Sequence, residues 1–293
     1  MRRWMLAPLL SLALASAARR RHALSSSGAA GATAVGTAIF GAGGLRAAAL
    51  LLLFFGSSTA LSRRRAAGSG AAAGPERTLA QVLANGGLPA ALAVCAHVRP
   101  SPRVVAAYGG ALAAANADTW ATEVGALSPA APRLITSGRR VPRGVSGAVT
   151  PRGTLASLAG ALVIGAGHAA LTLHPAAALR LGVAGLAGSL ADSVLGATLQ
   201  AVYVCQGCGQ RTEDRRHTHG SAAPALTLVR GLPLVTNDTV NVCAALAGAL
   251  TACVLHHDDR APRRERALSV ALCHGADPRR LRSGSAPARG VRL

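Results

Sequence analysis

Lysine is absent from the sequence, and acidic and aromatic residues are scarce. The 293 residues include 31 basic side chains, all of them arginine, against 11 acids, so the formal net charge is +20. Aromatic residues make up 2% of the chain, too few for the usual interfacial belt of Trp and Tyr. Because no nucleic-acid recognition motif accompanies the arginines, we expect no nucleic-acid partner. We interpret the charge as a basic surface that faces a membrane.

Hydrophobic residues make up 51% of the chain, and they gather in long segments. A membrane-spanning helix needs roughly 17 to 25 mostly apolar residues. The candidate segments are 5–18, 29–61, 79–98, 104–127, 154–179, 181–204 and 239–255. The sequence therefore predicts an all-α, polytopic integral membrane protein with about six or seven transmembrane helices and the lipid bilayer as its partner. The alternative is a soluble Ala-rich bundle, but its helices should carry a charged outer stripe.

Three parts can be distinguished along the chain. Residues 1–23 form an N-terminal helix or a targeting segment; we favour a first membrane helix over a signal or transit peptide. Residues 24–256 form the polytopic membrane domain, in which 62–78 is expected to be a flexible link. Residues 257–293 form a basic tail that we expect to be disordered. The sequence predicts neither the membrane orientation nor the oligomeric state.

Four acids lie inside or at the rim of the apolar segments, namely Asp118, Glu123, Asp192 and Asp238. Because an ionisable group is costly in a membrane, each is a candidate catalytic residue. Asp192 is the best placed, since it shares a narrow helical stripe with small and polar residues between Gly182 and Gln200. Such a stripe faces protein or a polar cavity. The alternative is a packing face on which the carboxyl group is only hydrogen-bonded to its neighbours.

The segment 116–125 carries two of these acids, and Mg²⁺ prefers oxygen ligands. Asp118 and Glu123 point about 140° apart on a straight helix, so both reach one ion only if the helix ends or unwinds there. We assign the Mg²⁺ ligands to Asp118 and Asp192. The alternative is a helix end with solvated acids.

The segment "TNDTVN" (236–241) predicts a helix start with Thr236 or Asn237 as the N-cap. Free N–H groups at such an end attract phosphate, so Asn237 and Asn241 are candidate phosphate- or nucleotide-binding residues. Asp238 together with Asn241, three residues apart, could add a metal ligand. The alternative is plain capping without a ligand.

A cluster of arginines interleaved with glycines follows the segment 116–125. Its predicted phosphate- or nucleotide-binding residues are Arg133, Arg139, Arg140 and Arg143. Forked guanidinium donors on a backbone that can approach closely suit an anion with several oxygens. The alternative is a solvated loop that faces lipid headgroups.

The segment "YVCQGCGQRTEDRRHTHG" (203–220) has a CxxC pair followed by two histidines. Cys205, Cys208, His217 and His219 would supply four tetrahedral ligands for a structural Zn²⁺ ion. A polar loop without metal is the alternative.

Several motifs taken in order resemble one family, among them "ADTWATEVGALS", "PRLITSGRRVPRGVSGAVTPRG", "GSLADSVLGATLQ", "YVCQGCG" and "GLPLVTNDTVNV". They are similar to the transmembrane protein 19 family, also called domain of unknown function 92, over roughly residues 24–250. The resemblance implies an integral-membrane fold. Because plant and algal members are phytyl-phosphate kinases, it also implies formation of phytyl diphosphate for tocopherol (vitamin E) synthesis and phytol salvage. For a plant or algal chain it implies a chloroplast membrane.

These observations together predict a membrane-embedded kinase for phytyl or another prenyl phosphate. The prenyl phosphate is the substrate, and the cofactors are Mg²⁺ and a nucleoside triphosphate whose base the sequence does not specify. A phosphate monoester nucleophile is already ionised, so positioning and charge neutralisation are the main requirements. The alternative is a multi-pass carrier or lipid-binding protein without catalysis, because intramembrane acids also mark ion pathways.

Overall fold

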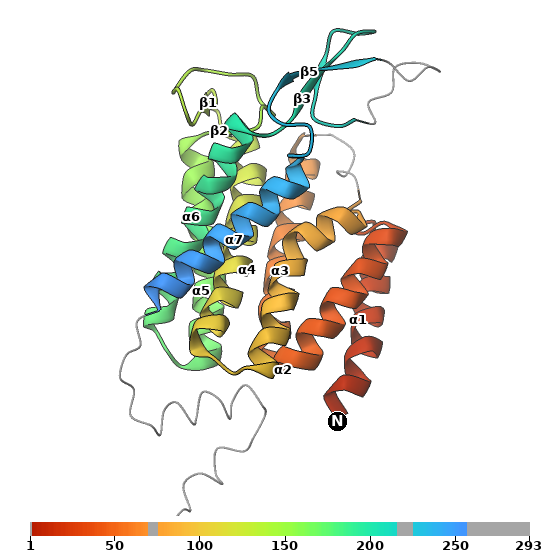
Figure 1. Cartoon of the computed structure of the whole chain (residues 1–293), viewed down its shortest axis with the longest axis vertical. Coiled ribbons are helices and arrows are strands. Elements are labelled where there is room, and N and C mark those ends of the chain that lie inside the picture. The colour runs from red at the N-terminus through yellow and green to blue at the C-terminus, as the bar shows by residue number, and fades with distance from the viewer. Residues whose placement is uncertain (1, 70–75, 216–224, 257–293) are drawn as a thin grey trace, which may run out of the picture. The chain divides into compact units, whose positions relative to one another are not determined.

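The computed structural model describes residues 2–69, 76–215 and 225–256; the predicted tail 257–293 lies outside these ranges. Within them the chain forms seven helices and five short strands (Figure 1). Their order is α1 (Arg2–Arg20), α2 (Ser26–Ser69), α3 (Leu79–Val98), α4 (Pro102–Ala126), β1 (Arg133–Leu134), β2 (Ala148–Val149), α5 (Pro151–Thr172), α6 (Ala176–Thr198), β3 (Val202–Cys205), β4 (Arg211–Thr212), β5 (Leu226–Arg230) and α7 (Asn237–Leu255).

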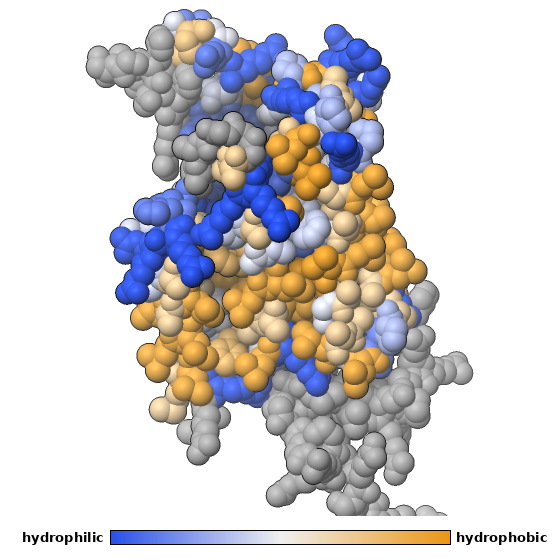
Figure 2. All heavy atoms as spheres, turned by 180° about the vertical axis from the view of Figure 1, so that it is seen from behind, coloured by the Kyte–Doolittle hydropathy of each residue, from blue (hydrophilic) through white to orange (hydrophobic). Residues whose placement is uncertain are grey.

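Five of the described helices are long and apolar enough to cross a membrane: α2, α3, α5, α6 and α7. Their outer faces keep large apolar side chains exposed, such as Leu155 at 68% and Val254 at 77% of full exposure. Figure 2 shows apolar side chains over much of the helical part, with hydrophilic side chains mainly in its upper half and a few at its lower end. Because an aqueous surface would not expose so many leucines, the prediction of an all-α polytopic membrane protein is confirmed.

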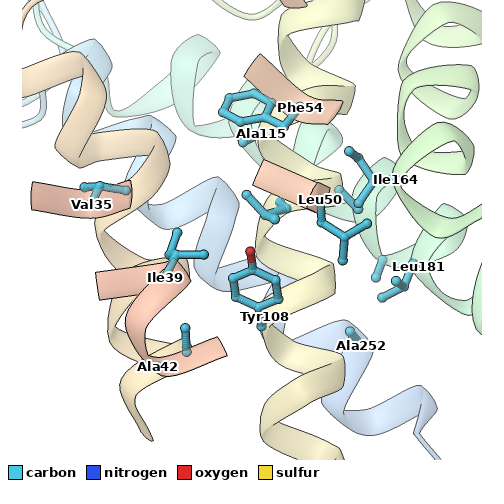
Figure 3. Packing of buried hydrophobic residues seen from close by; sticks show 14 residues of the cluster. Val35, Ile39, Ala42, Leu50, Phe54, Tyr108, Ala115, Ile164, Leu181 and Ala252 are labelled. Atoms are coloured by element: carbon cyan, nitrogen blue, oxygen red, sulfur yellow. The ribbon is translucent and has the colours of Figure 1, made fainter. Parts of the chain in front are cut away.

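Helix α4 is the central element, and it packs against α2, α3, α5, α6 and α7. Residues 107–117 are buried without interruption. A helix that is apolar on every face can only be stable when it is surrounded. Figure 3 shows part of the core around it, where Tyr108, Leu50, Ile164 and Leu181 meet. The Tyr108 hydroxyl group donates a hydrogen bond of 2.7 Å to the Ala47 carbonyl, so its polar atom is satisfied.

Small residues allow α4 and its neighbours to approach closely. A Cβ atom added to Gly110 would lie 2.4 Å from the Gly248 carbonyl oxygen, and one added to Gly248 would lie 2.6 Å from the Gly110 carbonyl oxygen. Such backbone contact is how helices associate in lipid, where the hydrophobic effect does not drive them together.

Helix α2 is one long element with a kink at Gly44, whose φ of 68° is in the left-handed region. It continues to Ser69, so the prediction of a flexible link over 62–78 is wrong for residues 62–69. Ala and Arg are strong helix formers, and side chains of this part are held by α4. Ser62 and Arg65 both bind the Glu123 carboxylate, which keeps the last turns of α2 in place.

The boundary between α5 and α6 differs from the predicted one. Helix α5 ends at Thr172, Leu173 is left-handed, and α6 begins at Ala176. His174 precedes a proline, which disfavours helical backbone at that position. Helix α6 then ends at Thr198, and the Arg230 guanidinium group donates a 2.9 Å hydrogen bond to the Gly196 carbonyl there. The predicted spans 154–179 and 181–204 are therefore too long at their C-terminal ends.

The strands lie at one end of the helices (Figure 1). β1 and β2 form an antiparallel pair in which Arg133 faces Val149, and β3 lies between β4 and β5 in an antiparallel sheet. β2 contacts α6, so the loop before it is held against the helices.

Candidate functional site

Two carboxyl groups meet between α4 and α6. The side chains of Asp118 and Asp192 lie close enough to interact directly, and both line the same cavity. Two carboxylates in contact must share a proton or have a cation between them, because like charges at this distance repel. The continuous helix α4 carries Asp118 toward α6, and Gly185 and Gly188 on α6 allow the two helices to approach.

A third acid, Glu213, comes from the loop after β4 and acts electrostatically on Asp192. Its carboxylate accepts a 2.7 Å hydrogen bond from the buried Gln200 side chain. The sequence analysis missed Glu213, because "RTEDRR" reads as a solvated loop and nothing in it indicates contact with the helices.

Two buried oxygens near this acid pair lack partners among the described residues. They are Oδ1 of Asp192 and Oγ of Ser157. Buried polar atoms are almost always hydrogen-bonded, so each unsatisfied one calls for an explanation. A ligand or an ion that completes their coordination provides one.

The acid pair opens into a cavity of about 720 Å³. The ends of five helices contribute to its wall, together with the loop 144–149. Helices α5 and α7 contribute their N-terminal ends: Thr150 caps α5 and accepts from the Gly153 N–H at 3.0 Å, and Asn237 is the first residue of α7. The open N–H groups of such ends favour anions.

The loop 144–149 is pressed against the end of α6. Gly147 has a φ of 80°, and a Cβ atom there would lie 2.5 Å from the Ala197 nitrogen. Only glycine fits this position, so the loop backbone can approach both α6 and the cavity closely.

Two arginines are among the lining residues, Arg65 of α2 and Arg143, which directly precedes the loop 144–149. Arg65 forms an ion pair of 3.1 Å with Glu123. The Arg143 guanidinium group donates to the carbonyl oxygens of Ala126, at 2.9 Å, and of Ser128. Arg143 therefore closes the C-terminal end of α4 while it borders the cavity.

The other arginines predicted for phosphate binding are placed elsewhere. Arg133, Arg139 and Arg140 are exposed and are not among the residues that line the cavity. Arg133 instead donates to the Gly138 carbonyl at 2.7 Å within its own loop. Of the four arginines predicted to bind phosphate, the structure thus brings only Arg143 to the cavity. It adds Arg65, which the sequence analysis had assigned to a flexible link.

Glu123 and Asp238 lie apart from the acid pair. Helix α4 runs without a break to Ala126, so Glu123 points away from Asp118 and toward Ser62 and Arg65. Asp238 is partly buried in the first turn of α7, and Thr236 is the N-cap, as predicted. Of the polar side chains predicted at this helix start, Asn237 lines the cavity, and Asp238 and Asn241 do not.

The donor set suits Mg²⁺ bound together with a phosphate ligand. In the part of the chain that the structure describes, no three His, Cys, Asp or Glu side chains are grouped to hold one ion. Mg²⁺ needs fewer, because it usually takes one or two carboxylates and fills its remaining positions with water and substrate phosphates. Asp118 and Asp192 provide such a pair, and the unpartnered Oδ1 of Asp192 is free to coordinate.

The predicted zinc site is only half described, because His217 and His219 lie outside the described residues. Cys205 and Cys208 are close enough for their side chains to hydrogen-bond. Burial raises the pKa of the Cys205 thiol, but hydrogen bonds from Cys208 and Gly207 outweigh it and lower the pKa overall. Since a thiolate is the form that binds zinc, this turn favours a metal ligand, and the zinc site stays a prediction.

Comparison with known proteins identifies a family and relatives that this sequence resembles. The family described as integral membrane protein DUF92 matches residues 9–249. Protein PGR of Arabidopsis thaliana is 34% identical over 199 residues, which cover 59% of this chain and 67% of that protein. An uncharacterized membrane protein of Methanocaldococcus jannaschii is 40% identical over 125 residues, 42% of this chain and 52% of its own length. No solved structure matches the chain.

Proposed function

The chain belongs to the DUF92 family of integral membrane proteins, and from this premise we propose that it is a kinase that converts phytyl or another prenyl monophosphate to the diphosphate. The observation that carries the proposal is the polar cavity, which combines a partly buried acid pair, an unpartnered Asp192 oxygen and two arginines. A phosphoryl-transfer site needs these parts, namely cation ligands for phosphate oxygens and carboxylates for the metal.

In the proposed reaction an oxygen of the prenyl monophosphate attacks the γ-phosphorus of a nucleoside triphosphate. The bond between this phosphorus and the β,γ-bridging oxygen breaks, and the nucleoside diphosphate leaves with the electron pair. No general base is required, because the attacking phosphate oxygen is already ionised.

The chain's own residues hold the two phosphate groups in line. Arg65 and Arg143 border the cavity and neutralise phosphate charge. The N-terminal ends of α5 and α7 and the loop 144–149 add backbone N–H groups. Asp118 and Asp192 would hold Mg²⁺, which when bound neutralises the charge of the phosphate oxygens. The Ser157 hydroxyl is placed to donate to a ligand in the same cavity.

The direct test offers phytyl monophosphate, Mg²⁺ and a panel of γ-labelled nucleoside triphosphates to the protein purified in detergent. We expect labelled phytyl diphosphate with at least one donor, and none when EDTA is present. A folded protein that makes no product from any donor would contradict the kinase.

A membrane carrier is the second candidate, and the acid pair inside the bundle is the observation that favours it. Buried carboxylates also mark ion pathways in transporters. The two functions differ in nucleotide use, so flux of prenyl phosphate across proteoliposomes without nucleotide consumption would support the carrier instead.

A further inference from the structure

A second, smaller cavity of about 130 Å³ lies among α1, α2 and α3. Most of its lining is apolar and includes Leu14, Val35, Leu51 and Val82. The polar lining residues are Arg77, Gln81, Asn85 and Ser11, and no acid is among the lining residues that the structure describes. The cavity is therefore a hydrocarbon-like space with one cation at its wall.

Arg77 is fixed by its backbone, whereas no carboxylate of the described residues forms an ion pair with its side chain. Its carbonyl oxygen accepts from the Ser25 N–H at 3.1 Å, and its own N–H donates to the Ala23 carbonyl at 3.3 Å. The guanidinium carbon lies 5.7 Å from the centre of the Phe55 ring. Burial lowers the pKa of Arg77, and the charge of Glu123 partly offsets this effect.

A half-buried guanidinium group is costly unless an anion satisfies it. Among the described residues, no carboxylate lies within 4.0 Å of the Arg77 side chain and no acceptor takes a hydrogen bond from it. Its stacking on Phe55 leaves the edge of the guanidinium plane available for the oxygens of a phosphate. Cation and apolar cavity together suit an amphiphile that has an anionic head and a hydrocarbon chain.

Glu123 connects this cavity with the polar one. Its carboxylate forms the 3.1 Å ion pair with Arg65, which lines the polar cavity, and its charge also acts on Arg77, which lines the apolar cavity. The two cavities thus share one acid between their arginines.

We propose that the apolar cavity receives the first part of the substrate's isoprenoid chain, with Arg77 beside the phosphate from which that chain extends. This inference rests on the proposed function for the identity of the substrate. An apolar cavity of about 150 Å³ holds one benzene molecule, so a space of this size takes roughly one five-carbon isoprene unit.

The test measures equilibrium binding of radiolabelled phytyl monophosphate and of phytol to the full chain in detergent, without nucleotide. Ala32→Phe fills the apolar cavity, and Leu155→Phe is its matched control on the exposed face. Arg77→Gln removes the cation, and Arg64→Gln is its matched control at an exposed arginine.

We expect Ala32→Phe to weaken the binding of both ligands about tenfold or more, since it removes the space for the isoprenoid chain. Arg77→Gln should weaken phytyl monophosphate about tenfold, as loss of a charge-assisted hydrogen bond does, and leave phytol unchanged. Both controls should bind like the original chain. If Ala32→Phe does not fold, the smaller change Ala32→Leu takes its place. The affinities of Arg77→Gln for phytyl monophosphate and for phytol also test the inference independently.

Unchanged affinities in both cavity variants would overturn the inference. So would a retained phospholipid that phytyl monophosphate cannot displace. The kinase activity is tested separately. If binding depends on Ala32 and Arg77 but no phosphate is transferred, the kinase proposal is wrong and the cavity assignment stands. If phosphate transfer is normal and both variants bind with unchanged affinity, the cavity assignment is wrong and the kinase proposal stands.

Discussion

Helix α4 passes through two different surroundings. Residues 107–117 are in contact with other helices on every side, and glycines bring backbone against backbone. The following turns border the polar cavity with Asp118, Ala121, Thr122 and Gly125. The first part stabilises the bundle and leaves no room for a ligand, whereas the second gives up packing in order to present polar groups. Stability and binding can therefore be altered separately on one helix.

The largest effect is expected at the acid pair. Asp192→Asn keeps the shape of the side chain but removes the charge that holds the metal and faces Asp118. We expect kcat to fall roughly 100- to 1000-fold, as for loss of one preorganised electrostatic contact, with little change in thermal stability in detergent. Glu76→Gln is the control, because Glu76 only pairs with the exposed His22 at 2.9 Å. Full activity of both Asp192→Asn and Asp118→Asn would refute the metal assignment.

Arg65 offers a sharper test, since it belongs to α2 and reaches the cavity through its ion pair with Glu123. Arg65→Gln removes a charge-assisted contact to a phosphate, worth about 1.5–3 kcal/mol, so kcat/KM should fall roughly 10- to 100-fold. Steady-state kinetics against both substrates would show which phosphate group it contacts. Arg64→Gln, at the exposed neighbour, should change kcat/KM less than twofold, and an equal loss in both variants would point to a general effect on α2.

The buried part of α4 is tested by a pair of glycine substitutions. Gly110→Ala places a methyl group 2.4 Å from the Gly248 carbonyl oxygen and must push α4 and α7 apart. We expect the free energy of unfolding to drop by about 1–3 kcal/mol. Gly87→Ala adds the same methyl group on α3, where no atom lies within 4 Å, and should leave stability unchanged or raise it by up to about 1 kcal/mol. Thermal unfolding in one detergent compares the two; equal melting temperatures would mean that this close packing contributes little.

The sequence was sufficient for the helices, because apolar segments of bilayer-spanning length are a strong signal. It also placed Asp192 on a polar stripe, since helical periodicity fixes which residues share a face. It could not show that Asp118 meets Asp192, because this contact depends on how α4 and α6 cross. Nor could it show that Glu213 and Arg65 approach the same cavity. Each lies in a segment of polar, solvated composition, and only the packing of the loop and of the extended α2 brings them there.

The smallest effect is expected where the sequence is most basic. Arg139 and Arg140 are exposed in the loop before β2 and do not line the cavity, in contrast to Arg143. Replacing both by Gln should change kcat/KM less than twofold, because exposed charges are screened by water and salt. Binding of the purified protein to vesicles rich in anionic lipid should weaken instead, since each arginine near such a surface contributes about 1 kcal/mol. A large loss of transfer activity in this double variant would mean that the loop closes over the phosphate groups. The binding region at the polar end of α4 would then include this loop as well as the residues that line the cavity.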